Sequence, residues 1–344
     1  GEWDSNGQVL WILDRFQQAT DTGFENAWMR GVQKGAEWIC LKRRSNERSG
    51  PYAGLFPPGF SAEHFGPNDY YYWDDFWGVA GLQAAARLCG RFLSEETRRK
   101  FAQEADDFEA IIAATIEAIP DRRSRGGIPA APLRRMDSGA VGSLVADYPL
   151  QITGPGDRRI MNTVAFLMQH CFHGGGFFQD MIHSGVNAYL TLAVAQTLLR
   201  AGDDRYRELI DSVARLASDT GQWPEAIHPL TGGGCMGDGQ HGWAAAEWVL
   251  AMRALFLREE GRRLLIGSGV FPEWLAAGNE LEFGPSPTRW GPVSVRICVE
   301  DAVCRVLLDA RWHDDDNPPE IEIALPGYEP KKVREIDAPV ELKQ

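Results

Sequence analysis

The sequence has 344 residues, of which 44% are hydrophobic and 24% charged, a composition typical of a globular protein of one large domain or two ordinary ones. No apolar run approaches the roughly 18 residues of a membrane span. Its 35 basic and 48 acidic residues give a net charge of −13, which repels nucleic acid and anionic lipid. We therefore expect no nucleic-acid partner and no membrane partner, and the charge favours a neutral or small ligand.

Six cysteines are spread thinly along the chain without a CxxC motif, so we expect no disulfide framework. Residues Gly1–Leu10 show no basic stretch followed by an apolar one, as a secretory signal would. These two features predict a cytoplasmic location.

Helical periodicity dominates up to about Arg263. The predicted helices are Asn6–Thr20, Phe24–Arg43, Asp75–Phe92, Glu95–Ile119, Ser138–Ala146, Arg158–His170, Ser184–Ala201, Arg205–Ser218 and Gly242–Arg258. In Glu95–Ile119 the apolar residues form one stripe, whereas Gly78–Leu93, Val186–Leu199 and Trp243–Leu257 are apolar on nearly every face. This alternation of amphipathic and enclosed helices predicts a mainly α protein, a two-layer α/α toroid built from helical hairpins.

The period changes to that of strands near Gly267. Val293, Val295 and Ile297 alternate with polar residues, and Glu320–Leu325 has a similar pattern. We expect a toroid catalytic domain over residues 1–265 and a small antiparallel β module over residues 266–344.

The segment Pro67–Gly78 (PNDYYYWDDFWG) combines aromatic residues with two adjacent acids at a loop-to-helix junction. Asp74 or Asp75 is expected to cap the helix. Aromatic rings stack on the apolar faces of pyranoses and carboxylates bind their hydroxyl groups, so this segment favours a sugar site. A helix cap with aromatic packing is the alternative. The expected sugar-binding aromatics here are Tyr72, Trp73 and Trp77.

A second candidate segment is Asp219–Trp243, a glycine-rich loop before an apolar helix. It carries Glu225 together with Trp223, His241 and Trp243, all expected to contact substrate or catalyse. An inverting glycosidase uses two carboxyls about 6.5–9.5 Å apart, of which one protonates the leaving oxygen and the other activates water. The acid must stay protonated near neutral pH, which an apolar surround or a neighbouring carboxylate favours.

Four short motifs resemble those of glucoamylases and related toroidal glycosidases, the six-hairpin glycosidase superfamily. WDDFWG looks like the family's WEEVNG-type sequence, and WPEAIHPLTGG followed by GWAAAEW resembles the loop that carries the general base. DSNGQVL and RRMDSGAVGSLVADYPLQ are similar to further family segments, the second to a sugar-contacting one. The resemblance implies that Asp74 is the general acid, Glu225 the general base and Asp75 a substrate ligand. It further implies hydrolysis of α-glucosidic bonds in oligosaccharides with inversion and without a metal or other cofactor.

If Asn6 begins the family's fourth helix, the first helices of the toroid are missing. A full ring of hairpins of roughly 45–50 residues each takes nearly 300 residues before any β module. We therefore expect one of three arrangements: the chain is a piece of a longer protein, a homo-oligomer or a partner segment completes the toroid, or the barrel is open. A phosphorylase on the same scaffold and a non-catalytic carbohydrate-binding or assembly protein are the alternatives.

Weaker candidates lie in the other connectors. Expected sugar contacts are Arg135, Asp137, Gln179 and Asp180, with Arg134 and His183 beside them in the sequence. Glu63, His64, Asn68 and Asp69 precede the aromatic segment and are either pocket residues or ordinary loop polarity.

Overall fold

The structure is a computed structural model that describes residues 1–45, 49–60, 67–180, 184–237, 239–300, 303–333 and 338–343. It contains two compact units, one made of Gly1–Asp14 and Gly23–Glu247 and the other of Arg15–Thr22 and Trp248–Gln344. Within the described ranges, no helix is both long enough and apolar enough to cross a bilayer. The domain boundary between residues 265 and 266 stays a prediction.

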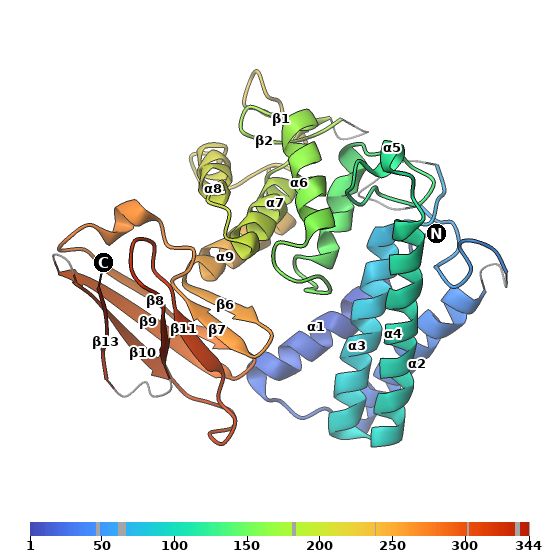
Figure 1. Cartoon of the computed structure of the whole chain (residues 1–344), viewed down its shortest axis with the longest axis horizontal. Helices are drawn as coiled ribbons and strands as arrows, with labels where there is room; N and C mark the ends of the chain where they lie inside the picture. The colour runs from blue at the N-terminus through green and yellow to red at the C-terminus, as the bar shows by residue number, and fades with distance from the viewer. Residues whose placement is uncertain are drawn as a thin grey trace. The chain divides into compact units, whose positions relative to one another are not determined.

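Helices dominate the chain up to Phe256, as the periodicity predicts (Figure 1). They are α1 (Ser5–Thr20), α2 (Asn26–Arg44), α3 (Tyr72–Phe92), α4 (Glu95–Glu117), the short α5 (Asp121–Ser124), the 3-10 helix η1 (Ser138–Ala146), α6 (Arg158–His170), α7 (Ala188–Ala201), α8 (Tyr206–Arg215) and α9 (Gly242–Phe256). Gly139 and Gly142 of η1 have low α propensity, consistent with its 3-10 form.

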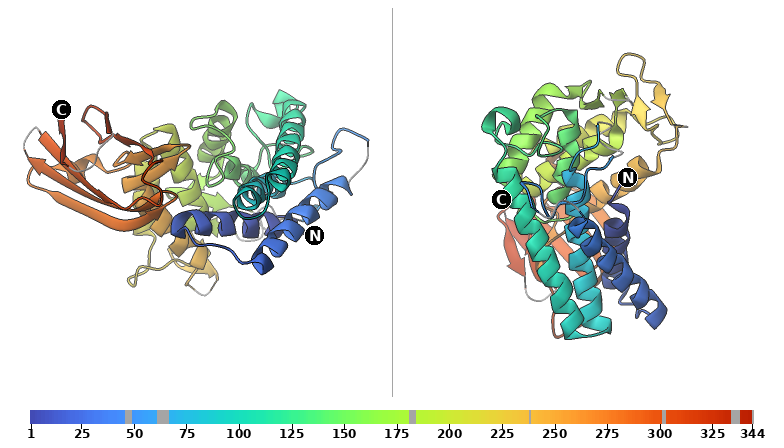
Figure 2. Two further views of the ribbon diagram at one scale, coloured as in Figure 1. Left: turned by 90° about the horizontal axis from the view of Figure 1, so that it is seen from below. Right: turned by 90° about the vertical axis from the view of Figure 1, so that its right-hand side faces the viewer.

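The helices of the first unit alternate between an inner and an outer layer. The long antiparallel pair α3 and α4 runs side by side in all views (Figures 1 and 2), and α7 packs against α8 in the same way. The inner α3 is buried along most of its surface, whereas α4 buries one stripe that contains Phe101, Ala105 and Phe108. This is the predicted toroid-type layering, in which amphipathic outer helices cover enclosed inner ones.

The inner helices α1 and α3 cross at a glycine contact. A Cβ atom on Gly7 would lie 2.1 Å from the backbone oxygen of Trp77, and one on Gly81 would lie 2.6 Å from the Cα of Gly7. Only glycine permits this approach. The contact brings the α1 side chains next to the tryptophans of α3.

Two details of the helices differ from the prediction. α3 begins at Tyr72, and neither Asp74 nor Asp75 caps it, because the Tyr72 N–H donates to the carbonyl of Ala130 (3.0 Å). Both acids instead occupy the first turn, where the helix dipole still favours negative charge. The α9 helix is not enclosed, because Trp243, Val249 and Leu250 are 49%, 65% and 45% exposed.

Loops at the edge of the first unit form a small sheet that was not predicted. Its order is β1-β2-β3-β4-β5, with strands Phe172–His173, Gly176–Gln179, Gly185–Val186, Ala226–Ile227 and Gly234–Met236. Gln179 pairs with Gly185 in β3, and β3 pairs with β4, directly after Glu225. The sheet therefore joins the loop before α7 to the loop before α9.

The second unit contains the predicted β module. Its sheets have the orders β13-β10-β9-β8 and β12-β11-β7-β6. The strands are β6 (Leu257–Glu260), β7 (Arg263–Ile266), β8 (Glu280–Thr288), β9 (Gly291–Glu300), β10 (Val303–Ala310), β11 (Glu320–Ile323), β12 (Lys331–Val333) and β13 (Val340–Lys343). All pairings are antiparallel except that of β11 with β7, and the alternating residues Val293, Val295 and Ile297 lie in the shared core. The first strand of this module is β6.

Candidate active site

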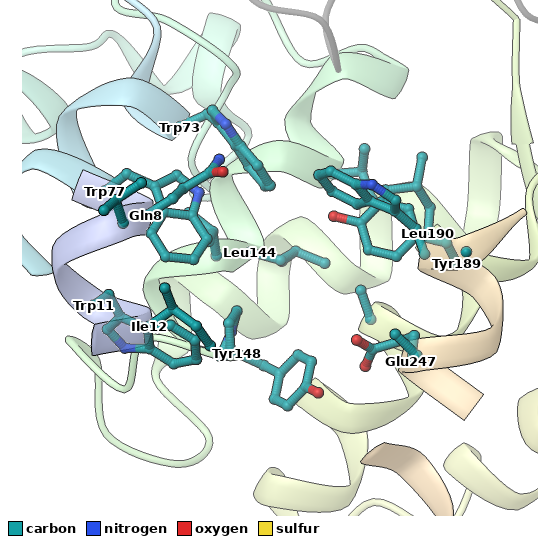
Figure 3. A pocket seen from close by; sticks show the side chains of 18 residues that line it. Gln8, Trp11, Ile12, Trp73, Trp77, Leu144, Tyr148, Tyr189, Leu190 and Glu247 are labelled. Carbon is teal, nitrogen blue, oxygen red and sulfur yellow. The ribbon is translucent and has the colours of Figure 1, made fainter. Parts of the chain in front are cut away.

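An aromatic cavity of about 530 Å³ lies within the first unit, between α1, α3, η1, α7 and the first residues of α9 (Figure 3). Six aromatic side chains line it: Trp11, Trp73, Trp77, Tyr148, Tyr189 and Trp243. Their rings contact one another edge to face, for example Tyr189 with Trp243 at 4.9 Å between centroids. A mostly apolar cavity with few polar groups is a typical small-molecule site. Of the residues predicted from the sequence, Trp73, Trp77 and Trp243 lie on its wall.

Asp74 lies next to this wall, in the first turn of α3, and is only 2% exposed. The backbone N–H of Trp3 donates to its carboxylate, while Oδ1 has no hydrogen-bond partner among the described residues. Burial, together with the nearby charges of Asp4 and Asp75, raises the pKa of Asp74 well above its usual range. The shift favours the protonated form of the carboxyl. Asp74 itself is not among the residues that line the cavity.

Asp4 connects the N-terminal segment to the cavity wall. Its Oδ2 accepts hydrogen bonds from Trp73 Nε1 and from Gln8 Nε2, both at 2.8 Å. These contacts fix the Trp73 ring and place a second carboxylate near Asp74.

Asp75 and Tyr72 point into the protein interior. Asp75 Oδ1 accepts the backbone N–H of Phe56 at 2.9 Å, and burial raises the pKa of Asp75 to about 8. The hydroxyl of Tyr72 is 3.2 Å from that of Thr115 in α4, and burial raises its pKa too. Both residues are fully buried and lie away from the cavity lining.

Glu225 lies in the loop that leads to β4 and is partly exposed. Gly237 packs against it, with an ideal Cβ position 3.3 Å from the Cβ of Glu225. Trp223 is buried and donates its indole N–H to the carbonyl of Val213 in α8 (2.8 Å). Its own carbonyl accepts the N–H of His241 (2.8 Å), and the His241 ring lies 6.5 Å from that of Tyr189. This loop is thus tied to α8 on one side and to the cavity aromatics on the other.

Two of the remaining predicted contacts, Asp137 and Asp180, lie at the N-terminal end of η1. Asp137 caps η1 by accepting the N–H of Gly139 (3.0 Å) and pairs with Arg134 (2.7 Å). Asp180 accepts a hydrogen bond from Ser138, the residue after Asp137. The structure therefore brings Asp137 and Asp180 together.

Arg135 and Gln179 have different surroundings from this pair. Arg135 is exposed, and Gln179 is buried at the end of β2. Asp69 is buried, and its Oδ1 accepts the N–H of Tyr70 (2.8 Å). Glu63, His64 and His183 lie outside the described residues.

Sequence reasoning missed the carboxylate that does line the cavity. Glu247 on α9 is 7% exposed, and Figure 3 shows it near Tyr148. Burial raises its pKa to about 7, although hydrogen bonds from Tyr148 and Gln196 oppose the shift. The sequence did carry one signal for this residue, because Glu247 is the single acid in the otherwise apolar stretch GWAAAEWVLAM.

Solved glycosidases share the fold of this chain. A glycosidase variant aligns with a TM-score of 0.53 at 17% identity, over 72% of this chain and 60% of that one. A bacterial glucoamylase in complex with acarbose aligns with a TM-score of 0.50 at 15% identity, over 74% of this chain and 40% of that one. The native α-L-rhamnosidase from Aspergillus terreus aligns with a TM-score of 0.57 at 12% identity, over 98% of this chain and 38% of that one.

These alignments confirm the predicted fold class, a mainly α protein of the α/α-toroid type with a β module at its C-terminal end. No protein-family profile matches the sequence, and no curated protein matches it significantly. The chain spans 60% or less of the length of these three glycosidases. The expectation that a partner segment or a second copy completes the toroid stays a prediction.

Proposed function

We propose that this chain acts as a glycoside hydrolase on oligosaccharides, with the sugar bound in the aromatic cavity. The observation that carries this function is the position of Asp74, a buried acid directly after Trp73 of the cavity wall. Tryptophan and tyrosine rings suit the C–H faces of a pyranose, and the acid beside them suits protonation of a glycosidic oxygen.

In this mechanism Asp74 is the general acid. Its raised pKa favours the protonated carboxyl that a general acid needs, and its Oδ1 has no competing hydrogen bond among the described residues. Burial and the charges of two nearby acids, Asp4 and Asp75, disfavour the ionised form of Asp74. The proton is therefore released when the leaving oxygen of the substrate accepts it.

Glu225 is the proposed general base, acting with inversion of configuration. Its partly exposed position gives its carboxylate access to water, unlike that of Asp74. Asp75 supports the acid from within the same helical turn. An inverting reaction needs the two carboxyls about 6.5–9.5 Å apart, so that a water fits between the base and the sugar.

The proposed substrates carry α-glucosidic bonds, and the similarity to the fold of a rhamnosidase adds α-L-rhamnosides as a second substrate class to test. One similar structure is a bacterial glucoamylase and another an α-L-rhamnosidase. Maltose, isomaltose, trehalose and an aryl α-L-rhamnoside should therefore be incubated with the protein, with the first-formed anomer followed by NMR. Hydrolysis with inversion is the expected result; retention, or turnover of none of these, would contradict the assignment.

A sugar-binding protein without hydrolytic activity is the second candidate. It is favoured by one observation, that neither Asp74 nor Glu225 lines the cavity. Calorimetric binding of maltose without turnover would support it. Turnover that requires added phosphate would instead identify a phosphorylase.

A further inference from the structure

Glu247 is the single carboxylic acid among the described residues that line the cavity. It lies on the second turn of α9, and its carboxyl group points toward the same region as the hydroxyl of Tyr148 (Figure 3). Lysine, arginine and histidine are all absent from that set of lining residues. The acid thus faces an apolar, aromatic space without a cation.

Two neighbours hold this carboxyl in place. Tyr148 and Gln196 both hydrogen-bond to it, and the Gln196 Nε2 also donates to the Tyr148 hydroxyl at 3.2 Å. Gln196 is 2% exposed and comes from α7, so the network connects three elements. Such a network fixes the orientation of a side chain as a binding site requires.

One oxygen of this carboxyl is left over. Glu247 Oε1 is buried and has no hydrogen-bond partner among the described residues. An unsatisfied buried polar atom costs about 1–3 kcal/mol, so a carboxyl with a purely structural role would be expected to have both oxygens paired. A ligand atom in the cavity would supply the missing partner.

We propose that Glu247 is a sugar-binding residue, whose Oε1 hydrogen-bonds to a hydroxyl group of a neutral pyranose held against the cavity aromatics. Tyr148 and Gln196 position it. This inference rests on the proposed carbohydrate function and deepens it by naming the class of sugar. A uronic acid is expected to bind more weakly, because its carboxylate would enter an apolar space that has no cation among the described lining residues.

Sugar binding can be measured directly, because the cavity tryptophans report on it through their fluorescence. The probes are maltose, L-rhamnose and D-glucuronate, titrated into wild type, Glu247→Ala, Glu247→Gln and Glu208→Ala. Glu208 is an exposed acid on α8 and does not line the cavity, so it is the matched control.

We expect saturable binding of at least one neutral sugar to wild type and at least tenfold weaker binding of glucuronate. Glu247→Ala should weaken neutral-sugar binding about 10- to 100-fold, the size of one hydrogen bond to an ionisable group. Glu247→Gln should retain affinity within about threefold, because the amide keeps a hydrogen-bonding atom at that position. The Glu208→Ala control should bind as wild type does.

If Glu247→Ala fails to fold, Gln196→Leu replaces it, with an expected rise in KM or Kd and an unchanged kcat. Unchanged affinity in folded Glu247→Ala, equal affinity for glucuronate, or no binding of either neutral sugar to wild type would overturn the inference. Sugar binding that depends on Glu247 without hydrolysis would uphold the inference while contradicting the glycosidase assignment. Hydrolysis with an unchanged KM in Glu247→Ala would contradict the inference while supporting the glycosidase assignment.

Discussion

Two buried acids, one in each compact unit, have opposite electrostatic surroundings. Asp74 in the helical unit has other acids near it, and its pKa is raised well above the usual range by burial, Asp4 and Asp75. Glu259 in the β module is also buried, and burial opposes its ionisation, but Arg15, Arg253 and Arg289 lower its pKa to about 2. Arg253 and Arg289 contact its two oxygens at 2.7 and 2.8 Å.

This difference matches the catalytic role proposed for Asp74 and predicts a stabilising role for Glu259. A paired carboxylate such as Glu259 is fixed in its charged form and has little tendency to exchange a proton. Asp74 has no salt bridge among the described residues, and burial disfavours its charged form. Groups with pKa values perturbed in this way concentrate at functional sites. Exchanging each acid for its amide tests this distinction, because the two substitutions should affect different properties.

The largest effect is expected for Asp74→Asn. Removing a general acid lowers kcat by about 10³-fold, whereas stability should change little, because burial already disfavours the charged form of the native carboxyl. Steady-state kinetics on the best α-glycoside and thermal unfolding should be measured together. Wild-type activity should also fall as the pH rises through the raised pKa of Asp74, because the acid must be protonated.

The matched control for this experiment is Glu208→Gln, which should retain full activity. Glu225→Gln should lose activity to a similar degree as Asp74→Asn if Glu225 is the base. An active Asp74→Asn variant would contradict the role assigned to Asp74.

Glu259→Gln should do the opposite, leaving kcat unchanged and lowering stability by about 3 kcal/mol. This is the lower end of the cost of breaking a buried ion pair, because both arginines are partly exposed. The pKa of Glu259 lies below its ordinary value, so its contribution is present above about pH 4.5 and disappears as the pH falls toward 2. Urea unfolding of both proteins at pH 7 and pH 3 should show a difference that shrinks at the lower pH. A constant difference would indicate that packing, not charge, is responsible.

Glu247→Gln should change the pH dependence of stability in the other direction. Burial raises the pKa of Glu247 from 4.5 to about 7, so the folded state binds a proton more tightly than the unfolded state. Wild-type stability contributed by this group is therefore complete below pH 4.5 and is lost as the pH rises to about 7, by up to about 3 kcal/mol. Unfolding midpoints of the variant should lack this slope between pH 5 and 7. Parallel curves for the two proteins would show that Glu247 titrates normally.

The sequence predicted the helices well because their period is a local property. Nearly every helix lies close to its predicted bounds, and the fold class is confirmed. The start of α3 was wrong because an acceptor distant in the sequence, the carbonyl of Ala130, binds the Tyr72 N–H. The small sheet from Phe172 to Met236 was missed because strands of two to four residues carry no usable period.

The site was harder to predict than the fold. The aromatic segment around Asp74 was visible as a cluster in the sequence, and Trp73 and Trp77 do lie on the cavity wall. Sequence order cannot show which way a side chain points, so Tyr72 and Asp75 were grouped with them although both are fully buried elsewhere. Glu247 was missed because its partners Tyr148 and Gln196 are far from it along the chain.

The smallest effect is expected for a third kind of acid, a helix cap. Asp157 accepts the N–H groups of Arg159 (2.9 Å) and Ile160 (3.1 Å) at the start of α6. This role requires a hydrogen-bond acceptor and not a buried charge. Asp157→Ala should therefore cost about 1 kcal/mol of stability, and Asp157→Asn only a fraction of that, since asparagine caps nearly as well. Neither variant should change kcat or the pH profile. The three acids would then differ by the group that each one faces: no cation at Asp74, arginines at Glu259, and backbone N–H groups at Asp157. A loss of activity in Asp157→Asn would contradict this division, because it would connect a cap on an outer helix to the chemistry.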